Sequence, residues 1–140
     1  MRNTIAVALA MLSAHGLPAA AQSMEPGQWQ FTSTITSSLL PQPQTSTSTE
    51  CVSKEDASDP TRFTGKDQTA NCKVTPGTRS SDSYSWTVSC PDQNMRGAGK
   101  ASFGRGTIDS EMQMTVEMGG QKMEMQTRTS GRLLGPCAAK

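Results

Sequence analysis

Thioether side chains are the groups in this sequence whose type and spacing most clearly allow chemistry. The segment 112–126 reads MQMTVEMGGQKMEMQ, with methionines at alternating positions around a Gly-Gly pair. Thioether sulfur is a soft ligand that selects Cu(I), and it also adapts to apolar molecules and fills irregular gaps in a core. The segment could therefore hold Cu(I) or Ag(I), line a binding surface, or form the inside of a hairpin. The candidate metal ligands are Met112, Met114, Met123 and Met125.

The Gly-Gly pair predicts how this segment folds. Gly119-Gly120 suits the two central positions of a tight hairpin turn, where the backbone needs positive φ angles. Such a turn places Met114 opposite Met125 and Val116 opposite Met123. Side chains alternate between the faces of a strand, so all four point to one side.

Charges favour this pairing over the alternative. The two-residue turn sets Glu117 against Lys122 and Glu111 against Arg128 on the other face. Opposite charges directly across a strand pair contribute about 0.2–1 kcal/mol each. A four-residue turn would set Glu117 against Glu124 instead. We therefore predict an amphipathic hairpin with sulfur and aliphatic groups inside and charges outside.

The first 21 residues have the features of a secretory signal peptide. Arg2 precedes a short apolar run, IAVALAML at 5–12, and Ala19-Ala20-Ala21 supplies small residues for cleavage. The run is too short to span a bilayer as a helix. We expect cleavage after Ala21, export to the periplasm, no membrane span after cleavage, and a single β domain over residues 22–140.

The remaining chain offers little for catalysis. The single histidine, His15, lies in the predicted signal peptide, so no imidazole base, Ser-His or Cys-His pair, or His-ligated zinc is expected. Without Arg2 the formal charge is zero, and there is no basic run, which argues against nucleic acid as a partner. We expect a protein that is not an enzyme and needs no cofactor.

Four cysteines are expected to compensate for a sparse apolar core. Cys51, Cys72, Cys90 and Cys137 are even in number, and an exported protein meets an oxidising compartment, so two disulfides are predicted. In the segment 72–90, a hairpin register that pairs Val74 with Val88 also pairs Cys72 with Cys90. This favours Cys72–Cys90 with Cys51–Cys137. The alternative joins Cys51 to Cys72 and Cys90 to Cys137.

The rest of the chain reads as strands with one short helix. Alternating or β-branched patterns predict strands, and Ser53, with Asp56 three residues later, predicts a capped helix that ends at Pro60. The predicted fold is all-β: an antiparallel meander in sequential order, curling into a small open or half barrel with two disulfides. Strands are expected at 28–35, 45–52, 97–103 and 107–118, with a hairpin at 72–90.

The order of motifs resembles a known family. The motifs are Pro26-Gly27-Gln28-Trp29; Cys51-Val52-Ser53 followed by Glu55, Ala57 and Asp59-Pro60; Trp86 four residues before Cys90, then Gly97 and Gly99; the methionine hairpin; and GRLLGPC at 131–137. Together they resemble the bacterial exported-protein family catalogued as domain of unknown function 3617, over residues 24–137. Leu133 stands where the family usually has a second arginine. The resemblance implies an exported protein and carries no activity or catalytic residues.

These observations leave three roles for the methionines. They pack as core, they line a cavity for an apolar small molecule at the mouth of the open barrel, or they bind Cu(I). We expect a non-catalytic, small binding or envelope-associated module, with a Met-based Cu(I)/Ag(I) protein as the alternative. The expected ligand-lining residues are Trp29, Phe31, Trp86, Phe103, Met112, Met114, Val116, Met123 and Met125.

Overall fold

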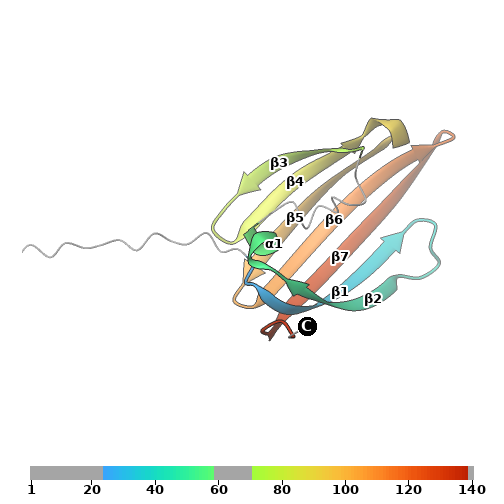
Figure 1. Cartoon of the computed structure of the whole chain (residues 1–140). Coiled ribbons are helices and arrows are strands. Elements are labelled where there is room, and N and C mark those ends of the chain that lie inside the picture. The colour runs from blue at the N-terminus through green and yellow to red at the C-terminus, as the bar shows by residue number, and fades with distance from the viewer. Residues whose placement is uncertain (1–23, 59–70, 139–140) are drawn as a thin grey trace, which may run out of the picture.

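A single curved antiparallel sheet forms the protein (Figure 1). The computed structural model describes residues 24–58 and 71–138. In this part of the chain, seven strands are ordered β2-β1-β7-β6-β5-β4-β3, and one short α-helix is present. The elements are β1 (Gly27–Ser37), β2 (Gln44–Val52), α1 (Lys54–Ser58), β3 (Lys73–Arg79), β4 (Ser83–Cys90), the 3-10 turn η3 (Pro91–Gln93), β5 (Met95–Gly104), β6 (Thr107–Met118) and β7 (Gln121–Gly135).

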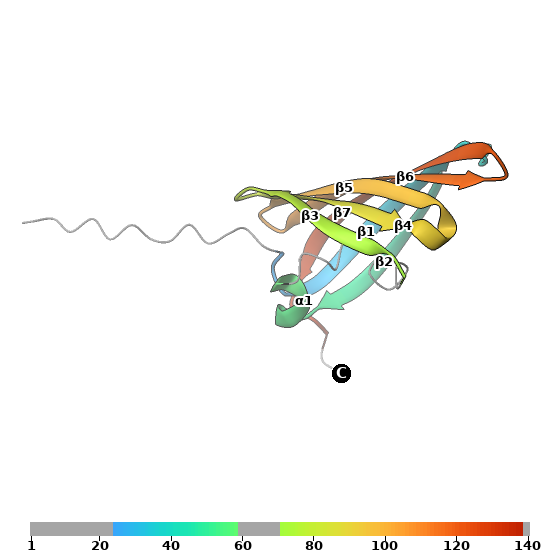
Figure 2. The same ribbon diagram turned by 90° about the horizontal axis from the view of Figure 1, so that it is seen from above.

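The strand order confirms the all-β, unclosed sheet and differs from a purely sequential meander at one place. The first strand, β1, pairs with the last strand, β7, so the opening lies between β2 and β3. This pairing places Phe31 beside Gly131 and Trp29 beside Leu133, which extends the apolar face across both ends of the chain. Figure 2 shows the two edge strands bending toward the side that carries α1.

The methionine hairpin has the predicted turn and register. Gly119 and Gly120 have φ angles of 58° and 78°, a conformation that glycine adopts without steric cost. Met114 pairs with Met125 and Val116 pairs with Met123. The thioethers of β6 and β7 therefore share one face, and the charged side chains of the hairpin share the other.

Helix α1 begins at the predicted cap. The backbone N–H of Asp56 donates to Ser53 Oγ at 3.1 Å, and the Ser53 hydroxyl donates to the Asp56 carboxylate at 2.9 Å. Ala57 is the residue that α1 buries, against the apolar face of the sheet. The predicted stop at Pro60 lies outside the described residues.

Both disulfides of the favoured set are present. Cys51 bonds Cys137 and Cys72 bonds Cys90, so the alternative pairing is wrong. The hairpin register that motivated this choice is also confirmed, since Val74 pairs with Val88. Beyond Pro76 the register of β3 shifts by a bulge. The bulge lies nearer the turn and leaves the cysteine end of the hairpin in the predicted register.

Two hydrophobic clusters lie on the apolar face, at different places on the sheet. The first joins β1, the end of β2 and α1, and the second covers β4 and β5. Phe103 packs against both clusters. The first cluster buries Met24, Trp29, Val52, Ala57 and Ile108; the second buries Tyr84, Trp86, Val88, Cys90 and Ala101.

Both faces of the edge strand β2 are exposed from Gln44 to Cys51. Its last residue, Val52, is buried. The Ser- and Thr-rich composition of this segment thus corresponds to a solvated strand. Side-chain hydroxyl groups of β2 form hydrogen bonds with hydroxyl groups of β1. Thr34 Oγ1 and Thr45 Oγ1, for example, are 3.0 Å apart. In the described part of the chain, no helix is both long and apolar enough to cross a membrane.

Candidate functional site

The methionine face is the candidate binding surface that the sequence predicted. We define it as the side chains of Met112, Met114, Val116, Met123 and Met125, which the strand register places on one side of β6 and β7. The apolar side continues on β5 and on β1, the strands that flank β6 and β7. Met114 and Met125 are direct cross-strand partners, and the predicted clustering of these residues in one place is therefore correct.

This face is not packed shut in the manner of the two clusters. Four of its five side chains are half-buried, and Met125 is 36% exposed. For comparison, Trp29 and Trp86 in the clusters are each 1% exposed. Half-buried thioethers lose part of their contact with water but do not gain the full set of packing contacts that a core residue makes. The face thus has apolar area left to bury.

Two neighbours that were not assigned to the site border the methionine face. Ile35 on β1 pairs with Thr127 on β7, and Thr127 pairs in turn with Met112. Both Ile35 and Thr127 are half-buried. Ile35 alternates with Trp29 and Phe31 on the same strand face. This alternation was visible in the sequence and could have placed Ile35 among the predicted lining residues.

The four aromatic residues predicted to complete the lining are distributed differently. Trp29 and Phe31 belong to the first cluster, with ring centroids 6.1 Å apart, and Trp86 belongs to the second. Between the first cluster and the methionine face lies a polar contact, Ser33 Oγ to Thr129 Oγ1 at 2.8 Å. Trp86 is the fully buried aromatic that is nearest to the methionine face, because Met112 packs against its cluster.

The geometry of Met114 bears on the copper hypothesis. An ideal Cβ placed on Gly97 would lie 2.2 Å from Met114 Sδ, so this sulfur rests over Gly97 on β5. Met125 lies on β7, on the other side of β6. The Met114 sulfur therefore turns toward β5, away from the strand that carries Met125. Among the described residues, no group of three or more His, Cys, Asp or Glu could hold a metal ion either.

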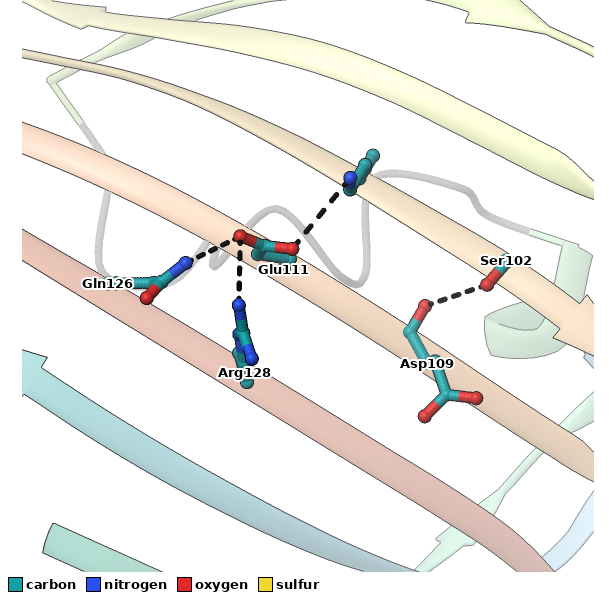
Figure 3. A network of polar contacts seen from close by, with 6 residues as sticks. Ser102, Asp109, Glu111, Gln126 and Arg128 are labelled. Carbon is teal, nitrogen blue, oxygen red and sulfur yellow. Dashed lines mark hydrogen bonds and ion pairs between the residues drawn. The ribbon is translucent and has the colours of Figure 1, made fainter. Parts of the chain in front are cut away.

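The opposite face of the sheet carries a charge network centred on Glu111 (Figure 3). Arg128 Nη2 lies 3.8 Å from Glu111 Oε1, which is the predicted cross-strand pair, and Lys100 Nζ lies 3.8 Å from Oε2. The Gln126 amide also donates to Oε1. Lys100 and Gln126 were not predicted, because they reach Glu111 from β5 and from a diagonal position on β7.

The second predicted ion pair takes different partners. Glu117 and Lys122 are cross-strand neighbours, as expected. However, Glu117 lies 3.7 Å from Arg96 on β5, and Lys122 lies 3.5 Å from Glu124 on its own strand. All four side chains are more than half exposed, so these pairs contribute little to stability.

Glu111 makes the polar face sensitive to acid. The hydrogen bond from Gln126 lowers the pKa of Glu111 most, and Arg128 and Lys100 lower it further, against an opposing effect of desolvation. A carboxyl group with a lowered pKa stabilises the fold above its ordinary pKa, and this contribution disappears as the pH falls through the lowered value. The network is thus expected to weaken in acid.

We predict that Glu111→Gln reduces the loss of unfolding free energy between neutral pH and about pH 3, because the amide does not titrate. The measurement is urea unfolding of both proteins at the two pH values. Glu117→Gln, which removes a carboxylate from a more exposed pair, is the matched control. Identical pH dependence in the wild type and in Glu111→Gln would contradict the prediction.

An open depression of about 660 Å³ crosses this polar face. Its lining comes from β1, β3, β4, β5, β6 and β7, and hydroxyl-bearing residues dominate it. Lys100 and Arg128, its cations, are both paired with Glu111 and are 74% and 69% exposed. A surface with water-accessible hydroxyls and neutralised charge offers a ligand little that water does not, so we place the candidate site on the methionine face.

The fold and the two faces define a small, disulfide-bonded protein built on one open antiparallel sheet. The family model described as "Protein of unknown function (DUF3617)" matches residues 24–137, and the chain belongs to this family. No curated protein and no solved structure matches the chain.

Proposed function

We propose that this protein is a non-catalytic binding module that holds an apolar molecule against its methionine face. The observation that supports this proposal is the incomplete burial of that face beside two well-buried clusters. A ligand that covers it would gain about 25 cal/mol for each Å² of apolar surface removed from water. Flexible thioethers can adapt to the shape of such a ligand without a rigid, preformed pocket.

The proposal includes export to the periplasm through a cleaved signal peptide. The leader-like composition of residues 1–21 supports it, and so do the two disulfides, because such bonds persist in oxidising compartments. The disulfides also occupy all four thiols, which leaves no cysteine nucleophile. This chemistry favours binding or an envelope-associated role over catalysis.

A charge placed on the methionine face tests the proposal. We expect Met125→Lys to weaken the binding of a fluorescent hydrophobic probe at least tenfold, which corresponds to about 1.4 kcal/mol, since a bound apolar molecule would desolvate the ammonium. Met125 is suitable because its exposure limits the effect on folding. Probe titration, together with a thermal melt of each variant, gives the two readouts.

Thr115→Lys is the matched control, because it adds the same charge to the same hairpin on the polar face. Thr115 pairs with Glu124 on β7 and with Arg96 on β5, so the added lysine meets one charge of each sign. Native mass spectrometry of protein purified gently from its own host should also show a bound apolar molecule. Equal probe affinity in both lysine variants, with no molecule found in repeated preparations, would refute the proposal.

A further inference from the structure

The two tryptophans differ in how their indole N–H groups are satisfied. Trp29 Nε1 donates to the backbone oxygen of Glu25 at 2.8 Å. Trp86 Nε1 is buried and has no hydrogen-bond acceptor among the residues that the structure describes. A buried donor without an acceptor destabilises the fold, so a ligand that supplies an acceptor would bind favourably at this position.

The unsatisfied N–H lies next to the methionine face. A Cβ placed on Gly99 would be 2.3 Å from Trp86 Cε2 and 2.8 Å from Nε1, so the N–H edge of the indole lies over β5. Gly99 pairs directly with Met112 on β6, and Met112 packs against the Trp86 cluster. Met112 has three rotatable side-chain bonds and is half-buried, so its movement can open a path from the methionine face to Nε1.

The surrounding charges restrict the chemistry of the acceptor. On β5, β6 and β7, the strand register places every charged side chain on the face opposite to the methionine face. The register also places Arg79 of the edge strand β3 on the Trp86 side, opposite Tyr84, but this cation is exposed. A carboxylate buried at Trp86 would therefore face one neutral donor without a buried cation, which is strongly unfavourable. A neutral carbonyl oxygen accepts the same hydrogen bond without that cost.

We propose that the ligand of the methionine face is a long-chain molecule with a neutral carbonyl group, such as an ester, whose oxygen accepts a hydrogen bond from Trp86 Nε1. This inference rests on the proposed binding function and names the class of its ligand. The chain packs along Met112, Met114 and Met125, and the carbonyl lies at the Nε1 edge of the indole, on the side of Met112. The hydrogen bond from Trp86 Nε1 is directional and fixes the orientation of the ligand, whereas the contacts with the thioethers are adaptable.

The test compares three probes of equal chain length: methyl decanoate, decane and decanoate. Each is titrated into the ¹⁵N-labelled protein with its disulfides intact, while the two indole N–H signals are followed by NMR. We expect methyl decanoate to shift the Trp86 signal downfield and to bind on the order of fivefold more tightly than decane, the effect of one hydrogen bond. The Trp29 signal is the internal control, because its N–H already has an acceptor.

Trp86→Phe should bind methyl decanoate and decane with equal affinity. If the wild type binds both equally and the Trp86 signal does not move, the carbonyl inference is wrong while the proposed function survives. Tighter binding of decanoate than of its ester would also overturn the inference. Failure of all three probes to bind would overturn it together with the proposed function. The wild-type spectra decide the matter even if Trp86→Phe does not fold.

Discussion

Replacing Cys51 and Cys137 with alanine is expected to lower the free energy of unfolding by about 4.5 kcal/mol. The two cysteines are 86 residues apart in sequence, and a bond that closes a longer loop removes more conformational entropy from the unfolded chain. Cys72 and Cys90 are only 18 residues apart, so the same model gives a loss of about 3 kcal/mol for their replacement.

The geometry of the sheet supports the larger effect. Gln28 on β1 pairs with Cys51 on one side and with Gly135 on the other. The chain that leaves β7 must therefore pass β1 to bring Cys137 to Cys51, where the Cα atoms are 5.4 Å apart. The long-loop disulfide thus joins the last residues of the sheet to its β2 edge.

The measurement is urea unfolding of the two double-alanine variants and the wild type under identical, non-reducing conditions. Each variant is the control for the other, since both lose one disulfide and keep one. A larger loss from the Cys72–Cys90 variant would show that native contacts, and not loop length, determine the contribution of each bond.

Trp29→Ala is expected to cost about 3–5 kcal/mol, the range found when a large buried aromatic side chain is removed. Trp29 is 1% exposed and contacts the cluster that joins β1 to α1 and to the end of β2. Its N–H also fixes the segment before β1 through Glu25. The loss of this side chain leaves a cavity and one unpaired carbonyl.

Ile35→Ala is the matched control for Trp29→Ala, because Ile35 is half-buried on the same face of the same strand. Denaturant unfolding should show a clearly smaller loss for it, and hydrogen exchange in Trp29→Ala should increase first in α1 and β2. If Ile35→Ala costs as much as Trp29→Ala, the first cluster is not the main source of stability at this end of the sheet.

Local patterns were sufficient to predict the methionine hairpin and to favour the disulfide set that is present. The positive-φ turn at Gly119-Gly120 fixed the register of β6 and β7, and the Val74–Val88 match identified the pairing of Cys72 with Cys90. In each case the deciding residues lie within a few positions of a turn, where alternation and charge leave few registers open.

Contacts between distant strands were harder to predict. The pairing of β1 with β7 joins segments about a hundred residues apart. No sequence pattern within either segment identifies the other as its pairing partner. Side-chain direction was also inaccessible: the sequence placed Met114 opposite Met125, but Gly97 provides the space into which the Met114 sulfur turns. The indole of Trp86 likewise lies over Gly99, a residue on another strand.

Phe103 is the residue common to both hydrophobic clusters, and this has a consequence for the cooperativity of folding. Each cluster has its own buried tryptophan, and the second also contains Cys90 of the Cys72–Cys90 disulfide. Two such regions could melt separately if nothing joined them. Because loss of either cluster exposes the same phenylalanine ring, the two regions share part of their stabilising free energy, and we expect the sheet to unfold as one unit.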